Sequence, residues 1–395
     1  MSLTRRDLLR SAGLLAGASA IGAEQPAGGA APAAAAPAAT VEPVDIPDYA
    51  RLAPTHMSKM AWEYISGGAA DELTLQWNHE AYDRIRLRPR VLVDVSKLDT
   101  RVTLLGQELA FPILLAPTAY HQLAHPEGEL ATARGAGAAD ATMVMSTSAT
   151  TSIEDIAAVA TRPLWFQLYV QRNRDFTIQL VRRAEAAGCK VLVVTVDSPV
   201  LGTRYRETRT KFTLPPGMER ANLRGLETAT GGHRATEGNI YSALLDPALT
   251  WKEIEWLRSI TRLPVVLKGI LNPDDAARAA DVGVAGVIVS NHGARNLDTA
   301  PATIDALPEV AARLGGRLPV LVDGGIRRGT DVLKAIALGA DAVLIGRAYL
   351  FGLAVGGAAG VTRVVNILRR EFEMAMALTG RTSIKEIAGT VLWPR

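Results

Sequence analysis

The stretch Gly286–Asp298 reads GVIVSNHGARNLD and places a cluster of polar side chains directly after a short apolar run. The run Val287–Val289 is β-branched, which is typical of a buried strand, and it stops at Ser290. In a parallel α/β protein, ligands bind at the carboxyl ends of the strands. At such a place His292 could accept a proton near neutral pH, and Arg295 could hold a carboxylate through two parallel hydrogen bonds. This segment alone leaves two interpretations open: a site that removes a proton from a small acid, or a loop with a solvated arginine and a structural histidine.

The rest of the folded chain repeats the same strand pattern. Eight apolar runs end in polar or small residues, at Ile113–Pro117, Thr142–Ser146, Leu164–Tyr169, Val191–Thr195, Val265–Lys268, Val287–Ser290, Val320–Asp323 and Ala342–Gly346. Helical patterns lie between most of them, as at Phe176–Ala187 and Thr330–Leu338. Alternating strands and helices predict an α/β fold with a parallel sheet, and eight such units favour closure into a (β/α)8 TIM barrel. A doubly wound open sheet is the alternative, but no GxGxxG motif follows the first strand.

Two segments depart from this rhythm. Apolar residues recur at helical spacing over Asp48–Gly67, which predicts a helical lead-in with Tyr64 in its last turn. The interval between Asp197 and Trp251, after the fourth strand, is far longer than an ordinary connection. We therefore expect a long inserted loop there, with residues 203–240 forming a mobile lid.

Residues 1–23 precede the folded part and resemble a twin-arginine export signal. Arg5 and Arg6 stand before a run of Ala, Gly and Leu that is too short to span a bilayer. Residues 24–42 are rich in Ala, Pro and Gly, which predicts a disordered linker. The folded domain is thus expected over residues 43–395, in a protein that is exported to the periplasm.

Composition limits the classes of partner. The chain has 395 residues, of which 48% are apolar, so it can bury a substantial core. Its net charge of +3 falls to +1 without residues 1–23, which argues against a nucleic-acid partner. The only cysteine, Cys189, excludes an intramolecular disulfide. We expect no metal site, and at most a peripheral contact of the Arg-rich insertion with a membrane surface.

The residues at the predicted strand ends are polar or small, as expected of a site in a barrel enzyme. They are Pro117, Thr118, Ala119, Ser146, Gln167, Tyr169, Thr195, Asp197, Lys268 and Ser290. A buried lysine such as Lys268 needs a negatively charged partner. After strands seven and eight come Asp323–Arg327 (DGGIR) and Gly346–Arg347, at the place where barrels commonly hold a phosphate. Each glycine turn taken alone could also be a simple tight loop.

From about Pro43 to Leu392 the chain resembles the FMN-dependent 2-hydroxy acid oxidoreductases, the family of glycolate oxidase, lactate oxidase and mandelate dehydrogenase. The resemblance rests on the motifs RPR (Arg88–Arg90), APTA (Ala116–Ala119), HPEGE (His125–Glu129), FQLYV (Phe166–Val170), TVD (Thr195–Asp197), SNHGARNLD (Ser290–Asp298), DGGIRRGTD (Asp323–Asp331) and IGR (Ile345–Arg347). It implies FMN as cofactor and oxidation of an (S)-2-hydroxy acid to the 2-oxo acid. The electrons would pass from FMN to dioxygen, a quinone or a cytochrome, and the enzyme would be a homotetramer.

The resemblance also implies catalytic roles. His292 would take a proton from the substrate, and Asp197 would stabilise its imidazolium form. Tyr169 would face the substrate hydroxyl. Lys268 would stabilise the anionic reduced flavin, a positive charge placed where negative charge develops.

Binding roles follow in the same way from the resemblance. Arg295 and Arg204 would hold the substrate carboxylate, with help from Tyr64. The flavin ring would be lined by Pro117, Thr118, Ala119, Ser146, Gln167, Tyr169, Thr195 and Ser290. The ribityl phosphate would be held by Gly325, Arg327, Gly346 and Arg347, with Asp323 and Gly324 nearby.

Two positions near the substrate depart from the glycolate oxidases. Ser148 stands where the plant enzymes carry a tryptophan, and Tyr120 stands where they carry a methionine. The smaller Ser148 makes room, so we expect a medium or large 2-hydroxy acid, aliphatic or aryl, rather than glycolate. Ala119 is usual in the oxidases and favours dioxygen as acceptor, whereas export favours a quinone or cytochrome.

Two other functions fit parts of the pattern. An FMN-dependent isomerase on the same barrel would need additional basic groups for a diphosphate substrate, and it gives no reason for the set Tyr64, His292 and Arg295. A non-catalytic exported flavin-binding protein would be expected to lack His292 or Arg295, and both are present.

Overall fold

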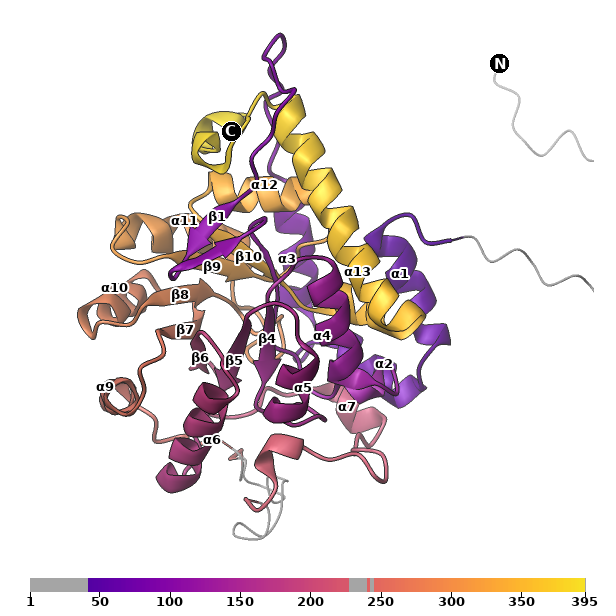
Figure 1. Ribbon diagram of the computed structural model, residues 1–395, viewed down its shortest axis with the longest axis vertical. Coiled ribbons are helices and arrows are strands. Elements are labelled where there is room, and N and C mark those ends of the chain that lie inside the picture. Colours follow the sequence, from indigo (N-terminus) through magenta and orange to yellow (C-terminus); the bar gives the residue numbers. More distant parts are fainter. Residues whose placement is uncertain (1–41, 227–239, 242–244, 395) are drawn as a thin grey trace, which may run out of the picture. The chain divides into compact units, whose positions relative to one another are not determined.

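Eight short parallel strands close into a barrel at the centre of the folded chain (Figure 1). They are β3 (Ile113–Leu115), β4 (Met143–Ser146), β5 (Leu164–Leu168), β6 (Leu192–Thr195), β7 (Val265–Ile270), β8 (Gly286–Val289), β9 (Val320–Asp323) and β10 (Ala342–Ile345). Neighbours in the barrel are neighbours in sequence, and β10 pairs with β3 with Val343 opposite Ile113. The predicted (β/α)8 barrel is therefore confirmed, and the open-sheet alternative is wrong.

This computed structural model describes residues 42–226, 240–241 and 245–394. The predicted export signal at 1–23, and the predicted linker up to residue 41, lie outside the described residues. Residues 43–395 form one compact unit.

A small hairpin fills the amino end of the barrel. β1 (Val102–Leu104) and β2 (Gln107–Leu109) pair antiparallel, and Leu104 and Leu109 pack into the same apolar cluster as the inward-facing strand side chains. Within that cluster the indole of Trp165 donates a hydrogen bond to the Gln107 amide oxygen at 3.2 Å. Because this end is filled, a cavity can open only at the carboxyl ends of the strands.

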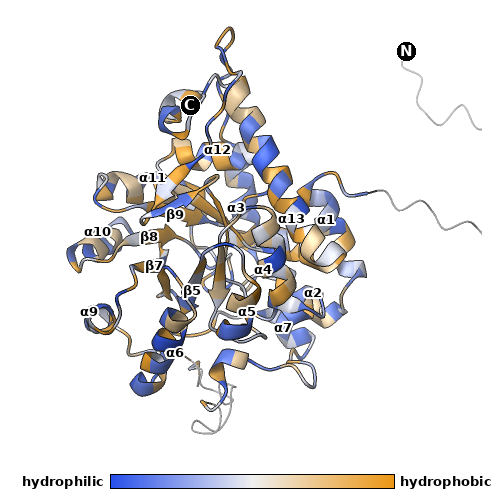
Figure 2. Cartoon of the chain, in the orientation of Figure 1, coloured by the Kyte–Doolittle hydropathy of each residue, from blue (hydrophilic) through white to orange (hydrophobic). Residues whose placement is uncertain are grey.

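Helices surround the barrel and bury the outward-facing strand side chains. The helices that follow the strands are α4 (Gly128–Ala138), α5 (Ile153–Val159), α6 (Arg174–Ala186), α9 (Trp251–Ile260), α10 (Pro273–Asp281), α11 (Thr303–Leu314), α12 (Gly329–Ala337) and α13 (Arg347–Leu378). Local sequence starts several of them: Asn173 caps α6, and Thr250 forms a capping box on α9. Figure 2 shows hydrophobic colours on the central strands and hydrophilic colours on the outer helices, such as α6.

α13 is the one helix of the described chain that is long and apolar enough to cross a membrane. It lies against α1, α4 and α12, and much of its apolar surface is buried inside the protein. Gly356 and Gly357 leave helical geometry and divide it into two helical parts. α13 is therefore a largely buried helix in the layer of helices that surrounds the barrel.

The lead-in and the insertion both contain short helices. The lead-in comprises α1 (Ile46–Leu52), η1 (Ala53–Thr55), α2 (Lys59–Ser66) and α3 (Leu73–Asp83). The described part of the insertion carries α7 (Tyr205–Arg209) and η3 (Ala221–Leu223), while residues 227–239 lie outside the described chain. Single 3-10 turns complete the elements: η2 (His121–Leu123), η4 (Ile384–Glu386) and η5 (Gly389–Val391). That the segment 203–240 moves as a lid stays a prediction.

Substitution of Gly360 by alanine should destabilise the fold, because the two parts of α13 touch backbone to backbone. A Cβ at Gly360 would lie 1.9 Å from the Gly352 carbonyl oxygen. We expect Gly360→Ala to lower the free energy of unfolding by about 1–3 kcal/mol, measured by urea denaturation. Gly356→Ala is the matched control, since nothing lies within 4 Å of its Cβ. Equal stability of the two variants would contradict this account of the packing.

Candidate active site

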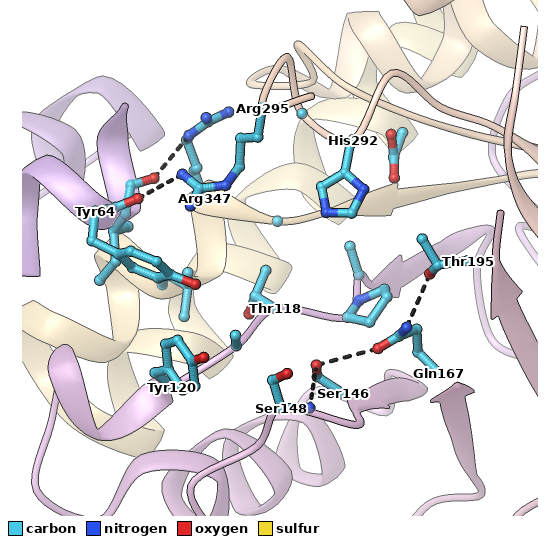
Figure 3. A pocket seen from close by; sticks show the side chains of 18 of the residues that line it. Tyr64, Thr118, Tyr120, Ser146, Ser148, Gln167, Thr195, His292, Arg295 and Arg347 are labelled. Atoms are coloured by element: carbon cyan, nitrogen blue, oxygen red, sulfur yellow. Dashed lines mark hydrogen bonds between the residues drawn. The ribbon is translucent and has the colours of Figure 1, made fainter. Parts of the chain in front are cut away.

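A cavity of about 880 Å³ opens at the carboxyl ends of the barrel strands. The predicted site residues that line it are Tyr64, Pro117, Thr118, Ala119, Tyr120, Ser146, Ser148, Gln167, Tyr169, Thr195, Arg204, Lys268, His292, Arg295, Asp323, Gly324, Gly325, Arg327, Gly346 and Arg347. The remaining two predicted residues, Asp197 and Ser290, lie behind the wall and contact His292. Ten of the lining side chains are labelled in Figure 3. The barrel thus brings together residues from the lead-in, the strand ends and the insertion.

His292 lies in a left-handed turn directly after β8. Its φ of +60° is followed by +62° at both Gly293 and Ala294, a conformation that non-glycine residues adopt only at an energetic cost. Side-chain hydrogen bonds hold the turn: the His292 amide donates to the Ser290 hydroxyl at 3.1 Å, and the Ala294 amide to the Asn291 side chain at 3.0 Å. The turn directs the imidazole into the cavity.

The imidazole of His292 is held from behind by a carboxylate. Its Nδ1 lies 2.8 Å from Asp197 Oδ1 and 3.3 Å from the Ser198 hydroxyl. Its Nε2 lies 3.3 Å from the Tyr169 hydroxyl, which also faces the cavity. An ionised Asp197 accepts the Nδ1 hydrogen, so the Nε2 lone pair is left toward the cavity.

Burial sets the charge state of this pair. Desolvation lowers the pKa of His292 from its ordinary value, and the charge of Asp197 opposes that shift without cancelling it. Burial also acts to raise the pKa of Asp197, but the His292 partner, with Lys268, outweighs it and holds this pKa below its ordinary value. At neutral pH the histidine is therefore neutral and the aspartate ionised, which is the arrangement of a general base.

Arg295 and Arg204 lie beside each other in the lining of the cavity. Arg295 donates from NH1 to the Tyr64 and Gly67 carbonyl oxygens, at 2.6 and 3.0 Å, and its guanidinium lies over the Tyr64 ring. Arg204 donates from Nε to the Arg295 carbonyl oxygen at 3.0 Å. Both arginines also contact Glu207, a residue that the sequence analysis missed. It belongs to none of the motifs on which the family resemblance rests.

Lys268 has the negative partner that its burial requires. Its Nζ lies 3.1 Å from Asp323 Oδ2 and donates to the Ser290 hydroxyl at 2.8 Å. The second carboxylate oxygen of Asp323 is buried at the cavity wall and has no hydrogen-bond partner in the described protein. A buried acceptor of this kind fits a hydroxyl donor on a ligand, such as the ribityl chain of FMN.

A chain of hydrogen bonds runs across the floor of the cavity. The Ser148 amide donates to the Ser146 hydroxyl, which donates to the Gln167 amide oxygen at 3.2 Å. The Gln167 amide nitrogen in turn donates to the Thr195 hydroxyl at 3.0 Å, as the dashed lines of Figure 3 show. This series of hydrogen bonds fixes the orientation of the Gln167 amide group, so a flat polar ligand meets a fixed pattern of donors and acceptors.

The loops after β9 and β10 form an anion cradle. Gly324 and Gly325 have φ values of +97° and +80°, and a Cβ at Gly325 would lie 1.8 Å from a backbone oxygen, so only glycine fits. Burial lowers the pKa of Arg327 to about 10, and burial together with neighbouring arginines lowers that of Arg347 to about 9. Arg347 also begins α13, so the helix amino end adds its partial positive charge. These features fit the FMN phosphate.

Two lead-in residues of the cradle were missed by the sequence analysis. Asn78 exchanges two hydrogen bonds with Asn291, at 3.1 and 2.8 Å, and thereby ties α3 to the turn that carries His292. His79 Nδ1 lies 3.2 Å from the Gly325 carbonyl oxygen, and burial beside Arg327 lowers its pKa to about 4. Both lie in an ordinary amphipathic helix, where no local pattern distinguishes them.

Comparisons with known proteins agree with this geometry. The model of the FMN-dependent dehydrogenase family matches residues 53–394. The chain is 51% identical to L-lactate oxidase of Nostoc sp. over 352 residues, covering 87% of this chain and 96% of that protein. It is 54% identical to peroxisomal (S)-2-hydroxy-acid oxidase GLO4 of Oryza sativa subsp. japonica over 349 residues, covering 87% and 94%.

Solved structures are similar as well. A structure of mandelate oxidase with (S)-2-phenylpropionate aligns at a TM-score of 0.81 with 40% identity, covering 90% of this chain and 99% of that one. The flavin-binding domain of baker's yeast flavocytochrome b2 aligns at 0.80 with 40% identity, covering 89% and 86%.

Replacing Asp197 by asparagine should lower the pKa of His292 further. The negative charge of Asp197 stabilises the imidazolium, so its loss favours the neutral ring and moves the protonation midpoint to lower pH. The measurement is a pH titration of the His292 ring by NMR in both proteins. Ser198→Ala serves as the control, since it removes a neutral hydroxyl that contacts Nδ1 and Asp197 Oδ1 but keeps the negative charge of Asp197. An unchanged or raised pKa in Asp197→Asn would contradict the assignment.

Proposed function

We propose that this chain, which belongs to the FMN-dependent dehydrogenase family, oxidises an (S)-2-hydroxy acid to the 2-oxo acid with His292 as the base. The observation that carries the proposal is the position of His292. Its Nε2 faces the cavity, Asp197 lies behind it, and two arginines suited to a carboxylate lie beside it. FMN, when bound, supplies the acceptor for the two electrons that the substrate loses.

The side chains divide the work of binding and proton transfer. Arg295 and Arg204 bind the substrate carboxylate and so fix the α-carbon and its hydroxyl relative to His292. Tyr169, whose hydroxyl adjoins His292 Nε2, donates a hydrogen bond to the substrate. His292 takes one proton in either order of events: from the α-carbon if that hydrogen leaves as a proton, or from the hydroxyl if it leaves as a hydride. The Asp197 carboxylate then stabilises the imidazolium.

Lys268 and the anion cradle serve the cofactor. The ammonium of Lys268 is a fixed, buried positive charge, oriented by Asp323, and it favours negative charge on a ligand beside it. Arg327, Arg347 and the glycine turns would hold the phosphate. Thr118, Ala119, Ser146, Gln167, Thr195 and Ser290 would contact the ring system.

Replacement of His292 by alanine tests the base. The FMN-loaded enzyme should be yellow, and its colour should bleach anaerobically when a 2-hydroxy acid is added. In His292→Ala we expect the bleaching rate to fall by about a hundred- to ten-thousand-fold while FMN stays bound, because the variant loses one positioned base. Loss of FMN would instead indicate a structural role for His292. An isomerase, or a non-catalytic flavin protein, would keep its colour with every acid.

A panel of acids tests the size of the substrate side chain. Ser148 and Tyr120 both line the cavity, and the small Ser148 leaves room on the substrate side of the site. We expect 2-hydroxyoctanoate or mandelate to bleach the enzyme with a higher kcat/KM than glycolate, with lactate between them. The measurement is the steady-state rate with each of these four acids. A clear preference for glycolate would overturn the prediction of a larger substrate.

We propose dioxygen as the electron acceptor. Ala119 lines the cavity, and the two relatives named above, 51% and 54% identical to this chain, carry the name oxidase. Readmission of air to the bleached enzyme should restore the colour at least as fast as turnover and release hydrogen peroxide. Slow reoxidation by air and fast reoxidation by a quinone would reverse this assignment.

Two further proposals concern the whole chain, one from the sequence of residues 1–23 and one from the resemblance to the family. Residues 1–23 direct export of the folded enzyme through the twin-arginine pathway, and the mature enzyme is a homotetramer. Cell fractionation tests the first, since Arg5→Lys with Arg6→Lys should retain the enzyme in the cytoplasm. Light scattering of the purified enzyme tests the second, and a monomeric mass would reject it.

A further inference from the structure

Glu207 is a cavity-lining carboxylate to which the proposed reaction gives no role. It lies on α7, in the insertion, and its side chain is 20% exposed. Its Oε1 accepts a hydrogen bond from Arg295 NH2 at 2.9 Å and from Arg204 NH1 at 3.4 Å. In the part of the chain that the structure describes, no other carboxylate forms an ion pair with either arginine.

We propose that Glu207 is an internal competitor for the substrate carboxylate: it occupies the arginine pair in the free enzyme and has to release Arg295 when the acid binds. This proposal rests on the function proposed above. Under this proposal, Glu207 sets the affinity of the site for the substrate and therefore the apparent KM.

Charge gives the first argument. Arg204 and Arg295 place two positive charges side by side with side chains only 13% and 15% exposed. Burial, and then the charge of Arg204, lowers the pKa of Arg295. A desolvated pair of like charges requires an anion. Glu207 supplies a carboxylate in the free enzyme, and the substrate brings the same chemical group to the same place.

The hydrogen-bond geometry gives the second argument. Arg295 NH1 uses its hydrogens on the Tyr64 and Gly67 carbonyl oxygens. A two-point grip of Arg295 on a substrate carboxylate must therefore use Nε and NH2. NH2 is the nitrogen that Glu207 holds. NH2 carries two hydrogens, and Glu207 accepts one of them. A substrate carboxylate on the other would place two negative carboxylates at one nitrogen atom, where they repel each other.

The two arginines have other partners that fix their orientation. Arg295 is fixed by two backbone carbonyls and by the Tyr64 ring, and Arg204 by the Arg295 carbonyl oxygen, so neither needs Glu207 for its orientation. α7 is anchored separately, since Arg206 bridges to Glu63 and Glu72 on the lead-in. Removal of the Glu207 charge should leave the arginines in place and free them for a ligand.

The test compares Glu207→Gln with wild type, both loaded with FMN. The probes are the 2-oxo acid product of the best substrate, which cannot be oxidised at this site, and the uncharged amide of the same 2-oxo acid. Binding is followed by the change in flavin absorbance. We expect Glu207→Gln to bind the 2-oxo acid about tenfold more tightly, because a charged hydrogen-bond competitor is lost, and to bind the amide as wild type does.

Kinetics and a matched control complete the experiment. The concentration of 2-hydroxy acid that half-saturates anaerobic bleaching should fall by a similar factor in Glu207→Gln. Glu63→Gln is the control, since it removes a carboxylate from the anchor of α7 without touching Arg204 or Arg295, and it should leave both affinities unchanged.

Unchanged or weaker binding of the 2-oxo acid by Glu207→Gln would overturn the proposal. So would an equal gain in affinity for the amide, or the same gain in affinity for the 2-oxo acid in Glu63→Gln. Failure of the proposed function looks different, because wild type itself would then not bleach with any 2-hydroxy acid.

Discussion

Positive charge buried at the carboxyl end of the barrel is the constraint on which the site depends. Five basic side chains line the same cavity, where burial makes an unpaired cation costly: Lys268, Arg204, Arg295, Arg327 and Arg347. The protein offsets part of that charge with Asp323 and Glu207. The remainder fits two anionic groups, a phosphate and a carboxylate, so the same excess of charge explains both the cofactor and the class of substrate.

The helical lead-in takes part in this balance. The last carbonyl groups of α2 have no partner within the helix and carry partial negative charge. Arg295 and Arg347 both donate to them or to the adjoining Gly67 carbonyl oxygen. The lead-in therefore positions two guanidinium groups that start from different strand ends. It also supplies Tyr64 and Asn78, so it completes the site and is more than a cover for the barrel.

Much of the site was predictable because catalytic barrels concentrate polar groups at strand ends, and strand ends are visible in sequence as the point where an apolar run stops. Ser290, His292 and Arg295 follow β8, and Asp323 ends β9. Glu207, Asn78 and His79 were not predicted. They lie on helices outside the strand rhythm, where an acid, an amide or an imidazole is ordinary surface composition until the chain folds.

The sequence by itself determined the barrel, the order of its strands and the residue types at the strand ends, because the burial of short β-branched runs is a local property. The tertiary structure alone decided which of those groups meet. Asp197 backs His292 across 95 residues, Glu207 holds Arg295 across 88, and Asn78 pairs with Asn291 across 213. Such contacts are fixed by closure of the barrel and by docking of the lead-in. The segment Gly286–Asp298 thus predicted a histidine and an arginine at a strand end, and the fold placed a carboxylate against each, Asp197 against His292 and Glu207 against Arg295.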